Sequence, residues 1–255
     1  MTLQQWLQQQ PFTLTMSSGF FGFFAHAGML QALIDHKLPP HAVSGSSAGA
    51  LIAGVYASGT PVDEMMRALK ALQKQDFWDP GVGLGLLKGR KFRGILGGLL
   101  AARRIEETQI PCHLSVWDAY SRSTRVIREG DLVTAIYASC AVPLLFQPIK
   151  INGRPCWDGG ISDRPGLAGT RAGERIFYHH IASRSPWRSS NSAALRVPEQ
   201  DNLSALSIFG LPRSGPSKMH LGSDIFQRAH QATYEALQRT VNAQGSSVEI
   251  NLDAS

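Results

Sequence analysis

Apolar and polar residues alternate over Phe12–Met16, and this two-residue period predicts a strand. From Phe23 to His36 the apolar residues recur every three or four positions, which predicts a helix with one apolar face. The helical period returns over Asp224–Val241. Because strand and helix patterns alternate along the chain between these segments, we predict an α/β fold with a mostly parallel sheet covered on both faces.

Turn residues and shorter apolar runs define the other predicted elements. Asn152 and Gly153 separate two short apolar runs, which is a strong local signal for a β-hairpin. A Ser-, Arg- and Pro-rich stretch, 185–202, predicts a surface loop. The remaining predicted strands are Ala42–Ser44, Cys112–Asp118, Thr124–Arg128 and Arg175–Ala182, and the remaining predicted helices are Thr2–Gln10, Ala50–Ala57, Val62–Lys74 and Asp131–Cys140.

Composition excludes several classes of protein. The chain has 255 residues and is 43% hydrophobic, which is enough for a sizeable core and excludes wholesale disorder. We expect residues 1–255 to form a single domain, because this length is common for one α/β domain. Three scattered cysteines without a Cys-x-x-Cys pair argue against a disulfide framework and against a zinc site. No cluster of oxygen ligands predicts calcium, so we expect no metal and no organic cofactor.

The N-terminal residues lack targeting signals. The first charged residue is Asp35 and the first basic one is Lys37, so the basic start of a signal peptide is missing. The most apolar early run, Phe20–Leu33, is shorter than the roughly 18 to 20 apolar residues that span a bilayer. We therefore expect a cytoplasmic protein whose contact with a membrane would be peripheral.

The net charge of +6 resides in one segment. Gly81–Arg104 holds six basic and no acidic residues, so the rest of the chain balances at 19 basic against 19 acidic residues. Basic residues interleaved with leucines suit an element that lies on an anionic membrane, and the glycines suit a lid. Ordinary packing of a helix and loop on the sheet is the alternative. A local basic segment without a recognised motif favours a membrane or an anionic substrate over nucleic acid.

Candidate chemistry begins at Gly45–Gly49, which reads Gly-Ser-Ser-Ala-Gly and lies between a predicted strand and a predicted helix. A serine nucleophile requires such a sharp turn, and the glycines Gly45 and Gly49 let it close around Ser47. The N–H of Ala48, at the start of the helix, would help to bind an oxyanion. A simple packing turn is the alternative interpretation.

A serine nucleophile also needs a base. At most two predicted strands precede Ser47, which leaves no room for the α/β-hydrolase order of strands with its histidine base. Asp158 ends the predicted hairpin before Gly159 and Gly160, and a carboxylate can act directly as the base. An ordinary Asp-Gly turn is the alternative. The histidine candidates are His26, predicted to be packed or capping, His179 and His180, which point to opposite faces of a strand, and His113, His220 and His230.

Four blocks of this sequence, taken in order, resemble the patatin-like phospholipases. The blocks are Ser17–Leu33, Val43–Gly59, Ala138–Pro148 and Asp158–Gly160, and they cover much of residues 12–165. The last 90 residues match only through the terminal helix. The resemblance implies a three-layer α/β/α patatin-like fold with a mostly parallel central sheet. It also implies a catalytic dyad of Ser47 and Asp158 without a histidine.

The same resemblance implies an oxyanion hole made by the loop Gly19, Phe20, Phe21 and Gly22 together with Ala48. The family's loop usually carries a Lys or Arg, and here none occurs from Phe12 to Gly28. Phenylalanines occupy the loop instead and suggest an apolar mouth for an acyl chain, with core packing as the alternative. The residues expected to face lipid are Phe23, Phe24, Lys88, Arg90, Lys91 and Arg93.

We therefore expect a serine lipid acyl hydrolase of the phospholipase A or lysophospholipase type. It would cleave carboxylic esters of lipids through an acyl-Ser47 intermediate that water then hydrolyses. An acyltransferase that uses the same intermediate and a catalytically silent lipid-binding protein are the alternatives. The expected partners are a lipid or acyl-ester substrate and, peripherally, an anionic membrane, but no nucleic acid.

Overall fold

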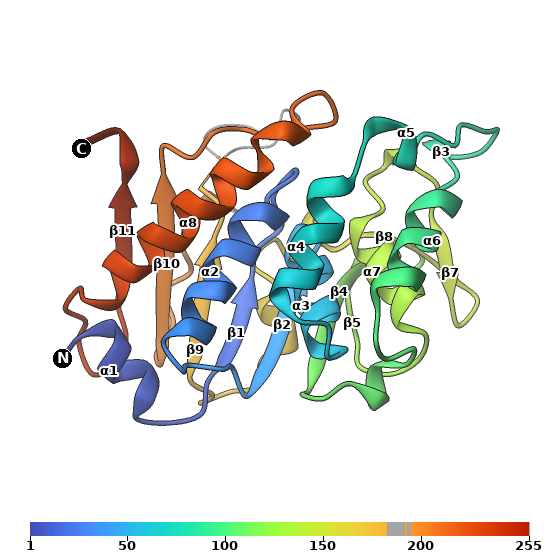
Figure 1. Ribbon diagram of the computed structural model, residues 1–255. Coiled ribbons are helices and arrows are strands. Elements are labelled where there is room, and N and C mark those ends of the chain that lie inside the picture. The colour runs from blue at the N-terminus through green and yellow to red at the C-terminus, as the bar shows by residue number, and fades with distance from the viewer. Residues whose placement is uncertain (183–191, 193–194, 255) are drawn as a thin grey trace.

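The computed structural model describes residues 1–182, 192 and 195–254 (Figure 1). Half of the predicted surface loop 185–202, residues 185–191 and 193–194, therefore lies outside the described residues. The strands are β1 Thr13–Met16, β2 Ala42–Ser46, β3 Gly85–Leu87, β4 Cys112–Asp118, β5 Ser123–Ile127, β6 Leu144–Phe146, β7 Ile149–Ile151, β8 Arg154–Asp158, β9 Ile176–His180, β10 Leu203–Phe209 and β11 Ser247–Asn251. The helices are α1 Leu3–Gln8, α2 Phe23–Asp35, α3 Ala48–Ala57, α4 Val62–Ala71, α5 Lys74–Phe77, α6 Arg90–Leu99, α7 Leu132–Cys140 and α8 Gly222–Leu237.

One mostly parallel sheet organises the molecule. Its strand order is β11-β10-β9-β1-β2-β4-β8-β7, and β5 pairs with β4. The strands from β11 to β4 are parallel, whereas the β4–β5, β4–β8 and β7–β8 pairs are antiparallel. The prediction of an α/β fold with a mostly parallel sheet is confirmed, and so is the hairpin at Asn152 and Gly153.

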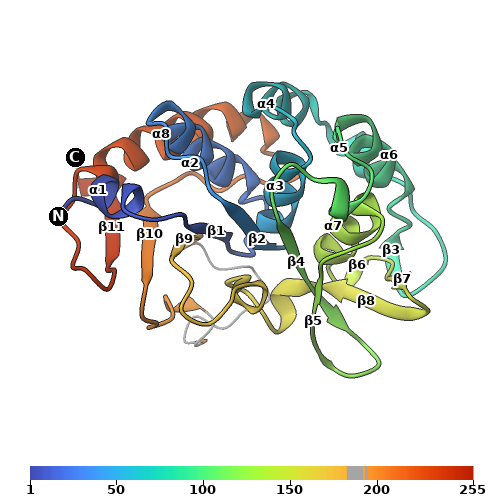
Figure 2. The ribbon, with the colours of Figure 1, turned by 90° about the horizontal axis from the view of Figure 1, so that it is seen from below.

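The two faces of the sheet have different covers. The labelled helices gather on one face, and the connection from β8 to β9 lies on the other (Figure 2). The 3-10 helix Leu167–Gly169 in this connection packs on β2, β4 and β5. Residues of β1 and β2 are buried throughout, as expected for parallel strands that are covered on both sides. The second cover thus consists of short 3-10 turns and loop segments.

The helix predicted over Val62–Lys74 is in fact two helices. The α4 helix ends at Ala71, because Leu72 adopts an extended conformation with ψ 135°. Gln73 then starts the short α5, and its backbone N–H donates to the Asp76 carboxylate at 2.7 Å. The break brings α5 against α6, which contributes to the candidate site below.

Helices α2 and α8 pack on each other at Gly28. A Cβ at this position would lie 2.3 Å from the carbonyl oxygen of Phe226 on α8. We expect Gly28→Ala to lower the free energy of unfolding by about 1 to 3 kcal/mol, because the helices must separate to admit the methyl group. Urea unfolding measures the change. Gly94→Ala is the matched control, since a Cβ at this position of α6 meets nothing within 4 Å and alanine favours a helix. An equal effect of both substitutions would contradict the proposed close packing at Gly28.

The three cysteines are free thiols, and Cys112 and Cys156 are buried. Burial raises the pKa of Cys112 to about 12 and raises that of Cys140 well above its ordinary value. Within the part of the chain that the structure describes, no helix combines the length and apolarity needed to cross a membrane.

Candidate active site

Ser47 occupies a sharp turn between β2 and α3. Its φ of +53° and ψ of −117° lie in a region that side chains other than glycine seldom adopt. A Cβ on Gly45 would lie 2.5 Å from the Gly49 carbonyl, and a Cβ on Gly49 would lie 2.0 Å from the Met16 carbonyl oxygen. The Gly-x-Ser-x-Gly spacing is therefore a steric requirement of this turn, and it fits the predicted nucleophile elbow.

The Ser47 hydroxyl donates a hydrogen bond of 2.6 Å to Oδ2 of Asp158. The other carboxylate oxygen of Asp158 accepts from the N–H of Gly160 at 2.8 Å, and the Asp158 N–H donates to the Ala141 carbonyl. Strand β8 pairs with β4 at this point, and the Asp158 side chain is buried. The two residues, 111 positions apart in the sequence, therefore come together with the carboxylate held in place. Gly159 begins the 3-10 turn Gly159–Ile161 that follows.

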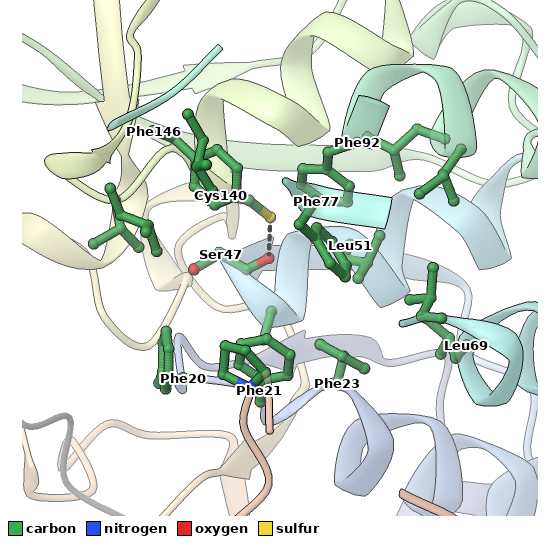
Figure 3. Close-up of a pocket in the computed structure, with 18 of the residues that line it drawn as sticks. Phe20, Phe21, Phe23, Ser47, Leu51, Leu69, Phe77, Phe92, Cys140 and Phe146 are labelled. Atoms are coloured by element: carbon green, nitrogen blue, oxygen red, sulfur yellow. Dashed lines mark hydrogen bonds between the residues drawn. The ribbon is translucent and has the colours of Figure 1, made fainter. Parts of the chain in front are cut away.

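Two residues that sequence reasoning did not single out hold the backbone of Ser47. The Ser47 N–H donates to Oγ of Ser139 at 2.9 Å, and the Ser139 hydroxyl donates to the Ser115 carbonyl at 2.6 Å. The Cys140 thiol donates to the Ser47 carbonyl at 3.2 Å (Figure 3). Both residues lie at the end of α7 and within the block Ala138–Pro148. The family resemblance therefore included Ser139 and Cys140 but assigned no role to either.

Two buried histidines, His26 of α2 and His179 of β9, form a hydrogen bond with each other. Nε2 of His26 donates to the Ser17 carbonyl at 2.8 Å, because a carbonyl can only accept. In neutral His26, Nδ1 must then accept from Nδ1–H of His179, at 2.8 Å. The remaining Nε2 of His179 is an acceptor that has no partner among the described residues. His26 is thus packed, as predicted, and the hydroxyl of Ser47 faces Asp158.

We expect acid to destabilise the protein through these histidines. Burial lowers the pKa of His26 to about 4, from an ordinary value of 6.5, and lowers that of His179 well below it. Between pH 6.5 and pH 4, these histidines are therefore protonated in the unfolded chain and neutral in the folded chain. Because protonation stabilises the unfolded state alone, the free energy of unfolding falls as the pH falls through this range. His26 alone contributes about 2 to 3 kcal/mol of this loss.

The measurement is urea unfolding at pH 7 and pH 4.5, combined with an NMR titration of the histidine rings. His220→Gln is the control, because His220 is exposed and its replacement should leave the loss unchanged. Protonation of His26 near pH 6.5 in the folded state would contradict the prediction.

The predicted oxyanion loop lies opposite Ser47. The Gly22 N–H donates to the Gly19 carbonyl at 2.9 Å, so it closes the loop as a turn. Phe21 has a φ of +56°, and its ring packs edge-on to Phe20, with ring centroids 4.9 Å apart. Ala48 is the first residue of α3, and N–H groups in the first turn of a helix have no acceptor within that helix.

An apolar cavity of about 180 Å³ opens at Ser47. Phe20, Phe21 and Phe23 lie on one side of Ser47, and Phe92 and Phe146 on the other (Figure 3). The cavity wall includes the apolar face of α6 and so part of the segment 81–104. Further lining residues are Leu51, Leu69, Phe77, Leu87, Leu96, Leu99 and Cys140.

The residues predicted to face lipid have separate locations. Phe23 lines the cavity, but Phe24 is fully buried against Gly222 of α8, because it lies one residue further around α2. The prediction for Phe24 is therefore wrong. The Arg93 guanidinium lies over the Tyr137 ring, 5.4 Å from its centroid. Lys88, Arg90 and Lys91 are exposed outside the cavity.

Among the described residues, no group of three or more His, Cys, Asp or Glu side chains could hold a metal ion. A serine hydroxyl bonded to a buried carboxylate, beside a cavity for an apolar group, is suited to nucleophilic attack on an ester.

Comparisons with known proteins identify similar sequences and a similar fold. The family model for patatin-like phospholipase matches residues 14–169. A protein named an uncharacterized NTE family protein of Mycobacterium tuberculosis is 31% identical over 154 residues, which are 59% of this chain and 42% of that protein. Lysophospholipase NTE1 of Cryptococcus neoformans is 28% identical over 164 residues, which are 60% of this chain and 10% of that protein.

The chain spans less than half the length of these relatives. Among solved structures, VipD from Legionella pneumophila superposes with a TM-score of 0.63 over 89% of this chain and 66% of that one. The identity is 14%, so this likeness is one of fold.

Proposed function

This chain belongs to the patatin-like phospholipase family and has its fold, and on that premise we propose that it is a serine lipid acyl hydrolase. Ser47 is the nucleophile of this proposal and Asp158 is the base. The observation that carries the proposal is the 2.6 Å hydrogen bond from the Ser47 hydroxyl to Asp158, at the edge of an apolar cavity. Membership of the family and the name of the fungal lysophospholipase support a lipid ester as the substrate.

In the proposed reaction, Oγ of Ser47 attacks the ester carbonyl while Asp158 takes the hydroxyl proton. Backbone N–H groups of Ala48 and of the Gly19–Phe21 turn stabilise the negative oxygen that forms. The alcohol leaves with the proton from Asp158, and the acyl group stays on Ser47. Asp158 then takes a proton from water as the water oxygen attacks the acyl-serine. When the bond between the acyl carbon and Oγ of Ser47 breaks, Asp158 gives that proton to Oγ, which releases the fatty acid and restores the serine hydroxyl.

A direct experiment tests this function. The full chain is incubated with a phospholipid and with the corresponding lysophospholipid, and free fatty acid is measured. An excess of an added alcohol or lysolipid distinguishes the acyltransferase alternative, because it would divert the acyl group from free fatty acid to a new ester. Absence both of fatty acid release and of labelling by a fluorophosphonate would favour the silent lipid-binding protein and overturn the proposal.

The segment 81–104 is proposed to contact an anionic membrane next to the cavity. Val82 is fully exposed, and the exposed fractions of Leu84, Leu86 and Leu144 are 68%, 49% and 83%. The strands β3 and β6, which carry Leu86 and Leu144, pair with each other, so these side chains share one region. The exposed basic residues Lys88, Arg90 and Lys91 belong to the same segment. Apolar side chains beside basic ones are typical of an interfacial surface.

We expect the triple variant Val82→Ser, Leu84→Ser, Leu144→Ser to bind vesicles of anionic phospholipid at least about tenfold more weakly, because three apolar side chains no longer leave water. Sedimentation with vesicles measures the binding. Tyr120→Ser is the matched control, since Tyr120 is 82% exposed on the β4–β5 turn. Equal binding by the triple variant and the native chain would remove this surface from the proposal.

A further inference from the structure

A second cavity lies beside the first and shares Phe20 and Phe21 with it. Its volume is about 560 Å³. It is bounded by the carboxyl ends of β9 and β10, by the first turns of α2 and α8, and by the segment Gly210–Lys218. In parallel α/β sheets, ligands bind outside the carboxyl ends of the strands, so this location is suited to a binding site.

The charged side chains that line this cavity are cationic. Arg213 and Lys218 contribute to its wall, and the described lining residues include no carboxylate. Burial lowers the pKa of His179 and His180, so these two wall residues are neutral at pH 7. The positive ends of two helix dipoles add to the two cations, because residues from the first turns of α2 and α8 line the same space. The cavity therefore favours an anion.

The segment that carries both cations is attached to the proposed oxyanion loop. Oγ of Ser214 donates to the carbonyl of Phe21 at 3.0 Å. Pro216 of the same segment lines the first cavity, whereas Arg213 and Lys218 line the second. The loop itself has no Lys or Arg between Phe12 and Gly28. Arg213 and Lys218 thus bring positive charge to this region from a segment almost 200 residues later in the chain.

From this arrangement we infer that the second cavity binds the phosphate of the substrate's polar head group through Arg213 and Lys218. The inference rests on the proposed function. With the acyl chain in the apolar cavity and the ester at Ser47, the polar part of the lipid would cross the Phe20–Phe21 turn into the second cavity. The substrate class is then a phosphate-bearing glycerolipid in preference to a neutral acylglycerol.

The test compares two substrates that differ only in the phosphate, an acylglycerol phosphate and the monoacylglycerol with the same acyl chain. The ratio of their kcat/KM values is measured for the native chain and for the double variant Arg213→Gln, Lys218→Gln. We expect the native chain to prefer the phosphate-bearing substrate and the ratio to fall at least tenfold in the variant. The control is Arg122→Gln, Lys150→Gln, which removes the same charge from exposed positions on the hairpins at the other end of the sheet and should keep the ratio.

A binding measurement separates the sources of phosphate. Calorimetric titration at constant ionic strength compares the binding of glycerol 3-phosphate, inorganic phosphate and chloride. Each ligand is titrated into the native chain and into the double variant that lacks Arg213 and Lys218. Loss of glycerol phosphate binding together with a lower ratio supports the head-group subsite. Loss of phosphate binding with an unchanged ratio would assign the cavity to free phosphate and overturn the head-group assignment.

The two proposals can fail separately. If the native chain hydrolyses both substrates but the double variant keeps the native ratio and the native affinity for glycerol phosphate, the subsite is wrong and the hydrolase stands. If the native chain hydrolyses neither substrate and is not labelled by a fluorophosphonate, the hydrolase is wrong, and the head-group assignment is overturned with it.

Discussion

Ser47→Ala is expected to abolish ester hydrolysis, with turnover lower by at least about 10⁴-fold, while the protein remains folded. The hydroxyl is the atom that would form the acyl-enzyme, and no neighbouring group can replace it at the same place in the turn. The alanine side chain needs no more room than the serine. A fluorophosphonate probe should therefore label the native chain and leave the variant unlabelled.

Ser46→Ala is the matched control, because this adjacent serine is buried and its hydroxyl has no hydrogen-bond partner among the described residues. It should keep near-native turnover and full labelling. Labelling that persists in Ser47→Ala would exclude Ser47 as the nucleophile, and mass spectrometry of the labelled peptide would then identify the residue that reacts.

Asp158→Asn is expected to lower turnover by about 10² to 10⁴-fold, the usual contribution of a general base. The amide has the same shape as the carboxylate, and its oxygen can still accept from the Gly160 N–H at the site of the present 2.8 Å bond. It cannot take the proton of Ser47. Both acylation and deacylation should therefore slow.

Thermal unfolding of Asp158→Asn checks that the fold is retained, since a misfolded variant would also lose activity. Asp163→Asn provides the structural comparison. Asp163 is a buried carboxylate that accepts from the Ser115 hydroxyl and from two backbone N–H groups, so its replacement should lower the melting temperature. Near-native turnover by a folded Asp158→Asn variant would remove Asp158 from the mechanism and return the histidines to consideration.

The candidate site was largely predictable because its geometry has a local steric basis. Only glycine fits at positions 45 and 49 of the turn, so the pattern around Ser47 is visible in five consecutive residues. The position of Asp158 follows from a hairpin with a strong turn signal. Their contact depends on the pairing of β4 with β8, which no local pattern contains, and only the resemblance joined the two residues.

Other parts of the fold were not predicted, for physical reasons. Strand β10 reads Leu-Ser-Ala-Leu-Ser-Ile-Phe, and its buried serines Ser204 and Ser207 disrupt the apolar run that would indicate a central strand. The strands β3 and β6 have three residues each and exist through their mutual pairing. The composition of the segment 81–104 does not show that its residues lie in two environments. The apolar face of α6 lines the cavity, whereas Arg90 and Lys91 of the same helix are exposed to water. Ser139 acts through a tertiary hydrogen bond, which sequence spacing does not encode.

The raised pKa values of the native thiols have a practical consequence for spectroscopy. Since burial raises the pKa values of Cys112, Cys140 and Cys156, these residues hold little thiolate at neutral pH and should react slowly with maleimides. A single cysteine introduced at Leu84, which is 68% exposed, could then carry a fluorophore or spin label without prior removal of the native cysteines. Such a label would report the depth to which this side chain enters a bilayer while the native core stays intact.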